Sequence, residues 1–321
     1  MKSLIVPVVT PSWLPSESDL LAAQNNGGVF TLYGAEWSTH TEMLIDWAPQ
    51  SFHDNCTRLL QSFAGRVSGI LVWGTTGEGP WFDPLQYGTL LTVMKHTCPK
   101  SIHLYAGVLG SDGQVWNQVQ VAQELWYDIV LGLNNYGCNN TDRFKSAMEK
   151  LSPAGRLLLY NLPTFKPANK EFVLGCLNDS RVVGFKDSSG DAEFFSWLLS
   201  LKAEKLDLQI FHGSEAGYWK LSSEELDFVD GLVAGTANVD SQLLREFTDD
   251  PHDTEIFDKL EILKSDVAFL SKRALSDTLP ATKIAKNIHG LKILLNRKGI
   301  LDNSSMYCHP SSTLFQTYQN R

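Results

Sequence analysis

Regular alternation of short apolar runs with longer amphipathic stretches is the feature that most constrains how this chain folds. From about residue 54 onward the alternation repeats roughly every thirty residues, which suits βα units. The expected strands are Leu4–Val9, Ser68–Trp73, Ile102–Gly107, Ile129–Leu133, Arg156–Tyr160, Val182–Lys186, Leu208–His212 and Phe228–Val233. The expected helices between them include Pro84–Thr97, Gln114–Trp126, Arg143–Leu151 and Asp191–Leu201. Eight such units predict an α/β fold of the (β/α)8 TIM-barrel type; an open doubly wound sheet, which usually has fewer units, is the alternative.

The end of the chain follows a different pattern. After the eighth strand no further strand pattern occurs, and apolar residues recur at helical spacing. These residues are Leu260, Leu263, Val267, Leu270 and Leu275, followed by Ile284, Ile288 and Leu291. We therefore expect a barrel over residues 1–253 and a helical C-terminal subdomain over residues 254–321.

A long segment at about residues 12–52 separates the first strand from the helix that comes after it. Connections between a strand and its helix usually have about two to six residues. This segment is rich in aromatic residues, and its Asn25-Asn-Gly-Gly28 sequence indicates a turn. It leaves the barrel on the face where active sites form, so it could act as a lid. A contact between subunits, or a segment that only packs on the surface of the barrel, is an equal alternative.

Composition narrows the class of protein. The 321 residues are 43% hydrophobic and 20% charged, and the chain has no apolar run of about eighteen residues, so we expect no membrane span. The formal charge of −9 argues against nucleic acid as a partner. The residues from Met1 to Thr10 read as a first strand and not as a secretory signal.

Cysteines and histidines form no recognisable ligand pattern. The five cysteines, at positions 56, 98, 138, 176 and 308, are scattered and odd in number, which favours a reduced, cytoplasmic chain over a disulfide framework or a zinc site. The eight histidines have no metal-ligand spacing. We expect neither a metal nor a cofactor.

Lys186 ends the apolar run Arg181-Val-Val-Gly-Phe-Lys186 and is followed directly by Asp-Ser-Ser-Gly190. Burial of a primary amine at a strand end disfavours its ammonium form, and a neutral lysine can attack a ketone to form a Schiff base. A lysine whose head reaches solvent is the structural alternative. Strand alternation places Phe185 and Asp187 on the opposite side, so we expect Asp187 to face the helices or to cap one.

Other polar motifs come directly after the strands, where barrel enzymes carry their chemistry. Gly74-Thr-Thr-Gly-Glu78 follows the second strand, and its successive amides could form an anion nest, although a simple turn is the alternative. Tyr160-Asn-Leu-Pro163 ends the fifth strand, where a tyrosine could relay protons or only fill the rim. His212-Gly-Ser-Glu215 and Gly235-Thr-Ala-Asn238 follow the last two strands.

Together these motifs resemble the dihydrodipicolinate synthase/N-acetylneuraminate lyase family. Gly74–Glu78, Tyr160–Pro163, Gly184–Gly190 and Gly235–Val239 occur in the order and at the spacing of that family, and the resemblance covers roughly residues 54–240 plus Thr10-Pro11. The resemblance implies a class I lyase or aldolase acting on pyruvate or another 2-oxo acid. Four motifs together are specific for the family and much less so for the substrate.

The resemblance also implies roles for individual residues. Lys186 would form the Schiff base, and the amides of Thr75 and Thr76 would hold the carboxylate of the 2-oxo acid. Tyr160 would move protons, linked through Thr75 to a second tyrosine, Tyr136, that reaches in from a neighbouring subunit. The active protein would then be a homo-oligomer, a dimer or more commonly a tetramer. The remaining candidates for substrate binding are Gly74 after strand two, Gly213 and Glu215 after strand seven, and Val233 at the end of strand eight.

One departure from the family pattern bears on the substrate. Where the synthases carry an arginine for the aldehyde's carboxylate, this chain has Phe165, and Lys166 cannot reproduce a bidentate fork. Glu215 lies near the place where sugar-acid aldolases of the family bind hydroxyl groups. We therefore favour a 2-keto-3-deoxy sugar-acid type of aldol cleavage or condensation. The synthase reaction of pyruvate with aspartate semialdehyde is the alternative, and a non-catalytic 2-oxo-acid or partner-binding barrel is a hypothesis of another class.

Overall fold

The computed structural model describes ten stretches of the chain. They are residues 2–7, 50–77, 84–109, 112–132, 144, 148–149, 155–161, 168–204, 207–274 and 283–302. Most of the expected insertion at 12–52 lies outside the described residues, as do Tyr136 and Phe165. Lys186, Tyr160 and Thr75 lie within them.

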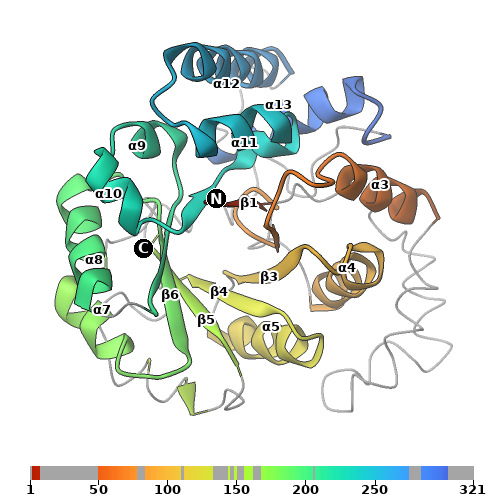
Figure 1. Ribbon diagram of the computed structural model, residues 1–321. Coiled ribbons are helices and arrows are strands. Elements are labelled where there is room, and N and C mark those ends of the chain that lie inside the picture. Colours follow the sequence, from red (N-terminus) through yellow and green to blue (C-terminus); the bar gives the residue numbers. More distant parts are fainter. Residues whose placement is uncertain are drawn as a thin grey trace, which may run out of the picture.

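Over these residues, eight parallel strands form a closed barrel, in which each strand pairs with the next one and β8 pairs with β1 (Figure 1). The strands are β1 (Ser3–Pro7), β2 (Gly69–Val72), β3 (His103–Val108), β4 (Asp128–Gly132), β5 (Leu157–Asn161), β6 (Val182–Asp187), β7 (Gln209–His212) and β8 (Gly231–Val233). The predicted TIM barrel is therefore confirmed. The largest difference is in β8, which begins three residues later than expected because Phe228 ends a helix with a Ser222–Glu225 capping box.

Helices surround the barrel, as Figure 1 shows. They are α3 (Gln50–Gln61), α4 (Pro84–Thr97), α5 (Asp112–Glu124), α7 (Lys170–Cys176), α8 (Ala192–Glu204), α9 (Glu215–Trp219), α10 (Ser223–Phe228), the 3₁₀ helix η5 (Gly235–Asn238) and α11 (Ser241–Asp249). The predicted helices Pro84–Thr97, Gln114–Trp126 and Asp191–Leu201 correspond to α4, α5 and α8. Asp191 caps α8, since its carboxylate accepts a hydrogen bond from the Phe194 amide at 3.0 Å. Most of the expected helix Arg143–Leu151 lies outside the described residues.

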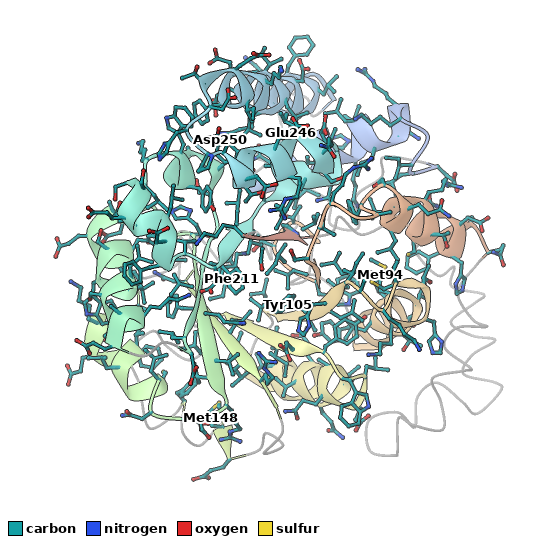
Figure 2. All side chains as sticks on the ribbon, in the orientation of Figure 1. Met94, Tyr105, Met148, Phe211, Glu246 and Asp250 are labelled. Atoms are coloured by element: carbon teal, nitrogen blue, oxygen red, sulfur yellow. The ribbon has the colours of Figure 1, made fainter. Side chains whose placement is uncertain are left out.

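Strand alternation divides the buried apolar residues into two layers. The larger layer lies between the strands and the helices. The smaller one fills the barrel interior and consists of Ile5, Leu71, Tyr105, Leu109, Val130, Leu158, Tyr160, Phe211 and Val233. Tyr105 and Phe211 lie near the centre of the barrel in Figure 2. The interior is thus packed with side chains and is no open channel.

Two further helices, α12 (Thr254–Ala274) and α13 (Lys283–Arg297), come after the barrel and pack against each other. Gly290 makes this approach possible, since a Cβ atom there would lie 2.1 Å from the carbonyl oxygen of Val267. The helical character predicted for this region is confirmed over the described residues. Its division from the barrel as a separate subdomain stays a prediction. No described helix is both long and apolar enough to cross a membrane.

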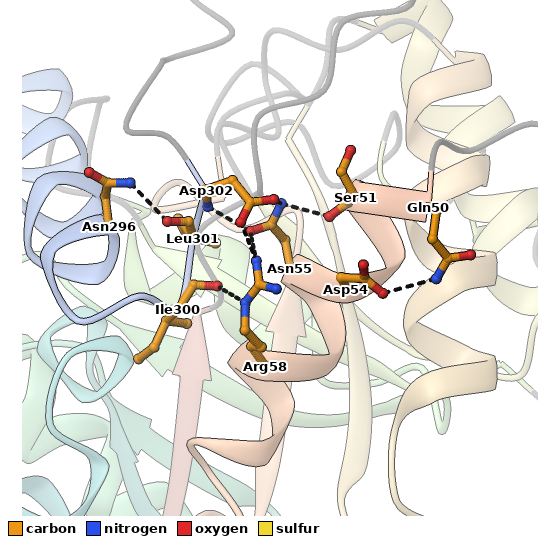
Figure 3. Close-up of polar contacts among 9 residues, drawn as sticks. All are labelled: Gln50, Ser51, Asp54, Asn55, Arg58, Asn296, Ile300, Leu301 and Asp302. Atoms are coloured by element: carbon orange, nitrogen blue, oxygen red, sulfur yellow. Dashed lines mark hydrogen bonds and ion pairs between the residues drawn. The ribbon is translucent and has the colours of Figure 1, made fainter.

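A polar network joins the segment after α13 to helix α3 (Figure 3). Asp302 receives hydrogen bonds from Arg58 Nη2 at 2.5 Å and from Asn55 Nδ2 at 3.0 Å, and its amide donates to Asn55 Oδ1 at 2.8 Å. Arg58 Nε also donates to the Ile300 carbonyl at 3.0 Å. These contacts fasten the segment after α13 to α3.

Candidate active site

Lys186 and Tyr160 are direct neighbours across β6 and β5. Each has only 5% of its surface exposed, and the Lys186 Nζ lies 3.7 Å from the centroid of the Tyr160 ring. Tyr160 belongs to the interior layer, so the amine and the phenol share the inside of the barrel. Lys186 is therefore not the solvent-reaching lysine of the structural alternative, because its head lies over an interior ring.

Two opposing effects act on the Tyr160 phenol. Burial opposes its ionisation and would raise its pKa. The positive charge of Lys186 favours the phenolate, as do interactions with the side chains of Thr75, Ser188 and Lys186. The second set of effects is larger, so the pKa of Tyr160 is lowered. A phenol with a lowered pKa gives up and takes back a proton more readily near neutral pH. Tyr160 is thus suited to proton transfer beside the amine of Lys186.

Thr75 follows β2 and reaches the same place. Its buried Oγ1 influences the Tyr160 phenol but makes no hydrogen bond of ordinary geometry among the described residues. The turn that carries it is closed by a hydrogen bond from the Gly77 amide to the Gly74 carbonyl at 2.9 Å. Within the described part of the chain, no backbone hydrogen bond uses the Thr75 or Thr76 amide as donor. The role of both amides as an anion nest stays a prediction.

Ser188 joins this group and was not among the residues singled out from the sequence. Its side chain lowers the pKa of Tyr160, and its Oγ lies 3.5 Å from the Gly213 carbonyl oxygen. A Cβ atom at position 213 would come within 1.8 Å of that Oγ. Gly213, expected to bind substrate, thus makes room for Ser188. The position of Ser188 could have been predicted from the sequence. It comes two residues after Lys186, so strand alternation places both side chains on the same face of the strand.

The candidate residues after β7 and β8 meet at one part of the barrel rim. The Thr236 hydroxyl donates to Glu215 Oε1 at 2.6 Å. A Cβ atom at Gly235 would lie 3.4 Å from Thr76 Oγ1, so the rim reaches the turn after β2. Glu215 is partly exposed at the start of α9. A carboxylate and two hydroxyl groups therefore lie near one another beside the turn after β2. Val233 is buried in the interior layer, and its role in substrate binding stays a prediction.

Asp187 lies apart from this group, as strand alternation predicts. Its carboxylate accepts hydrogen bonds from Asn161 Nδ2 at 2.8 Å and from Ser189 Oγ at 2.9 Å, while neighbouring Phe185 contacts Phe194 of α8. Burial raises the pKa of Asp187 to about 6. The expected helix-facing position is confirmed; capping of α8 is done by Asp191 instead.

His212 also faces the helices and not the barrel interior. Its ring contacts Phe195 and Tyr218, and its Nδ1 accepts a hydrogen bond from the Ser214 amide at 3.1 Å. Burial lowers the pKa of His212 to about 4, so the ring stays neutral and has a packing role. Among the described residues, no group of three His, Cys, Asp or Glu side chains could hold a metal ion.

No model of a protein family matches this chain, but curated relatives and solved structures do. It is 28% identical over 162 residues to an "Uncharacterized DapA-like lyase" of Chloroflexus aurantiacus, covering 47% of this chain and 53% of that protein. It is 27% identical over 192 residues to a 4-hydroxy-tetrahydrodipicolinate synthase of Herminiimonas arsenicoxydans, covering 57% and 63% of the two chains. The alignments thus span between half and two thirds of these relatives.

Structural similarity extends over nearly the whole chain. A dihydrodipicolinate synthase of Bacteroides thetaiotaomicron matches with a TM-score of 0.70 at 18% identity, covering 100% of this chain and 98% of its own. A Ruminococcus gnavus sialic acid aldolase matches with a TM-score of 0.66 at 13% identity. The match covers 99% of this chain and 96% of the aldolase chain. A 2-keto 3-deoxygluconate aldolase of Picrophilus torridus matches with a TM-score of 0.60 at 20% identity. This match covers 91% of this chain and 93% of that aldolase.

The predicted family resemblance is confirmed. The chain is similar in sequence to a lyase and a synthase of the dihydrodipicolinate synthase/N-acetylneuraminate lyase family, and its fold is that of the family's solved structures. The residues that carry the resemblance are those that the barrel brings together. Lys186, Tyr160 and Thr75 come from three different strand ends and meet in one place.

Proposed function

We propose that this protein is a class I lyase or aldolase that forms a Schiff base between Lys186 and pyruvate or another 2-oxo acid. One observation carries the proposal: the Lys186 Nζ is buried 3.7 Å from the centre of the Tyr160 ring. A lysine needed only for solubility would be placed on the surface, because burial of an amine is costly. The names of the curated relatives and the solved structures support the same reaction class.

The residues of the site suggest an order of steps. Once the Lys186 ammonium has given a proton to the Tyr160 phenolate, the free amine attacks the ketone carbon, and Tyr160 returns the proton as the carbinolamine loses water. The resulting iminium withdraws electrons from the adjacent carbon, so that a carbon–carbon bond there can break or form through an enamine. Tyr160, with Thr75 and Ser188 beside it, then takes back or returns the proton. Its lowered pKa supports both directions of transfer.

Binding of the 2-oxo acid is assigned to the turn after β2. The amides of Thr75 and Thr76 would hold the carboxylate, as successive N–H groups do in anion nests. The Thr75 hydroxyl is close to both this site and the Tyr160 phenol. Carboxylate binding would therefore place the ketone next to the amine.

For the reaction we favour aldol cleavage or condensation of the 2-keto-3-deoxy sugar-acid type, in which the partner of pyruvate is a hydroxylated aldehyde. The Thr236–Glu215 hydrogen bond joins a carboxylate and a hydroxyl group at the rim, which suits polyol recognition. Phe165, outside the described residues, replaces the arginine that resemblance to the synthases would require. The synthase reaction is the second candidate, because a curated relative carries that name and Thr75 lies beside Tyr160.

The assembly and location follow from the same proposal. If Tyr136, outside the described residues, completes the relay from a neighbouring subunit, the active form is a homo-oligomer, and we propose a homotetramer. A cytoplasmic location suits the dispersed cysteines, of which Cys56, Cys98 and Cys176 are free thiols in the structure.

Borohydride trapping tests the proposal directly. The protein is incubated with pyruvate, reduced, digested and mapped by mass spectrometry. We expect one pyruvate-derived adduct, on Lys186, and its loss in Lys186→Met, which keeps an unbranched side chain of similar length. Lys292, also buried but on α13, is an internal control and should remain unmodified. A wild-type protein that gives no adduct with pyruvate or with several other 2-oxo acids would support the non-catalytic barrel instead.

A substrate panel separates the two reaction candidates. The purified protein is assayed with 2-keto-3-deoxy sugar acids, with N-acetylneuraminate, and with pyruvate plus aspartate semialdehyde. We expect turnover with a sugar acid and a loss of that turnover in Glu215→Gln. Rapid turnover of aspartate semialdehyde alone would establish the synthase reaction in place of the sugar-acid reaction.

A further inference from the structure

Trp73 has an unusual backbone conformation for a bulky residue. It stands between β2 and the Gly74–Gly77 turn, has a φ of 62°, and is 1% exposed. A bulky residue reaches this left-handed region only at an energetic cost, so the surrounding structure must hold it there. Trp73 is one of two described non-glycine residues with a positive φ, the other being the exposed Trp126 far from the site in the sequence.

Contacts with Tyr87 help to hold Trp73 in place. Its indole N–H donates to the Tyr87 carbonyl at 2.9 Å, and the Trp73 and Tyr87 rings stack with centroids 5.7 Å apart. The Tyr87 hydroxyl in turn donates to the Gly107 carbonyl on β3 at 3.1 Å. Burial raises the pKa of Tyr87, so this hydroxyl stays protonated and remains a donor.

Gly107 completes the arrangement from the neighbouring strand. A Cβ atom there would lie 2.3 Å from the Trp73 carbonyl oxygen and 2.9 Å from the Gly74 nitrogen. The peptide between Trp73 and Gly74 therefore packs directly on the Gly107 backbone. This peptide leads into the Thr75 and Thr76 amides, so its orientation sets theirs.

We propose that Trp73 is a positioning residue whose left-handed backbone, held by Tyr87 and Gly107, aims the Thr75 and Thr76 amides at the carboxylate of the 2-oxo acid. The inference rests on the proposed function and adds a specific consequence to it. Loss of the indole donor or of the Tyr87 hydroxyl should weaken recognition of the carboxylate without removing the nucleophile. Chemistry at Lys186 should continue once the substrate is bound.

Trapping with borohydride over a range of pyruvate concentrations tests this inference. Trp73→Phe keeps an aromatic ring but loses the donor, and Tyr87→Phe loses only the hydroxyl. We expect each to raise the half-saturating pyruvate concentration by roughly tenfold, since small misplacement of binding groups is costly, while the plateau of Lys186 adduct stays near the wild-type value. With methyl pyruvate, which lacks the carboxylate charge, the variants and the wild type should differ by less than about twofold.

A matched control distinguishes positioning from general stability. The Tyr127 hydroxyl donates to the Leu91 carbonyl at 2.7 Å and is buried like that of Tyr87. Tyr127→Phe should lower the melting temperature to a similar extent and leave the half-saturating pyruvate concentration unchanged. If Trp73→Phe does not fold, as judged by circular dichroism, Tyr87→Phe decides alone.

The possible outcomes distinguish the positioning role of Trp73 from the proposed Schiff-base function. Unchanged pyruvate half-saturation in the folded variants, beside normal trapping by the wild type, would overturn the positioning role and leave the proposed function intact. Equal weakening for pyruvate and methyl pyruvate would also overturn it, because the carboxylate would not be the group affected. No trapping by the wild type would reject the proposed function itself and this inference with it.

Discussion

The amine of Lys186 lies over the face of the Tyr160 ring, with Nζ 3.7 Å from the ring centroid. The two residues are paired across β6 and β5, so the strand register sets their approach. A cation gains electrostatic attraction from an aromatic face, and a phenolate would strengthen that attraction further. The charge of Lys186 therefore favours the phenolate form of Tyr160, which suits proton transfer between the two groups.

Removal of the Tyr160 hydroxyl should slow the chemistry more than it weakens binding. Tyr160→Phe keeps the ring under Lys186, and we expect kcat to fall by about 100- to 1000-fold, as for loss of a general acid–base group. Steady-state kinetics with the active substrate measures this fall. Tyr218→Phe is the matched control, because the buried Tyr218 hydroxyl makes no hydrogen bond among the described residues and the ring contacts His212. Equal losses of activity in the two variants would contradict the role of Tyr160.

Ser188 should tune the proton affinity of Tyr160. Its interaction lowers the pKa of the phenol, so Ser188→Ala should raise that pKa above its wild-type value. The difference in ultraviolet tyrosinate absorbance between each protein and its Tyr160→Phe counterpart, followed with pH, reports the titration. Ser189→Ala is the control one residue away, because the Ser189 hydroxyl bonds Asp187 on the opposite side of the strand. A phenol pKa that is equal in both variants would exclude the role of Ser188.

The barrel and its central lysine could be predicted from the sequence because both depend on local pattern. Period-two alternation and strand–helix spacing are properties of neighbouring residues, and they placed Lys186 inside and Asp187 outside. The same rule, applied two residues further, would have included Ser188. Substrate binding by Gly213 stays a prediction, and the close approach of Ser188 Oγ to Gly213 became visible only in the structure.

The conformation of Trp73 was beyond prediction from the sequence. A positive φ is unfavourable for tryptophan, and contacts with Tyr87, fourteen residues away, and with Gly107 on the next strand help to stabilise it. Such long-range packing overrides local preference, so it is visible only once the strands are placed. The pairing of Thr236 with Glu215 is of the same kind.

His212 should make the folded state sensitive to acid. Its pKa is lowered to about 4 in the folded state from an ordinary value of 6.5, so the unfolded chain binds more protons between these values. The stability from neutral His212 is complete above pH 6.5 and lost as pH falls toward 4, a change of about 3 kcal/mol. His212→Gln should remove this contribution of His212 to the pH dependence of stability, while keeping an acceptor for the Ser214 amide. Urea unfolding at several pH values between about 4 and 7 measures it.

Asp187 should act with the opposite sign. Its pKa rises from 3.8 to about 6 on folding, so the folded state holds the extra proton, and stability falls as pH rises through this range. In wild type the two slopes offset each other. His212→Gln should therefore become less stable as pH rises from about 4 to 6, and Asp187→Asn should become more stable. Parallel pH profiles for the two variants would contradict the assignment of these pKa shifts.

Asn55 should matter more to stability than the ion pair beside it. It is 4% exposed and bonds Ser51, Arg58 and Asp302 through both ends of its amide (Figure 3). Asn55→Ala leaves partly buried groups without partners and should lower the free energy of unfolding by about 1–3 kcal/mol. The Arg58–Asp302 pair is partly exposed, so salt should screen it and leave the cost of Asn55→Ala almost unchanged. Lys259→Ala, which breaks the exposed pair with Glu255 on α12, should have a much smaller effect than Asn55→Ala. A strong reduction of the Asn55→Ala effect by salt would instead mean that charge, and not the buried amide, fastens the segment after α13 to the barrel.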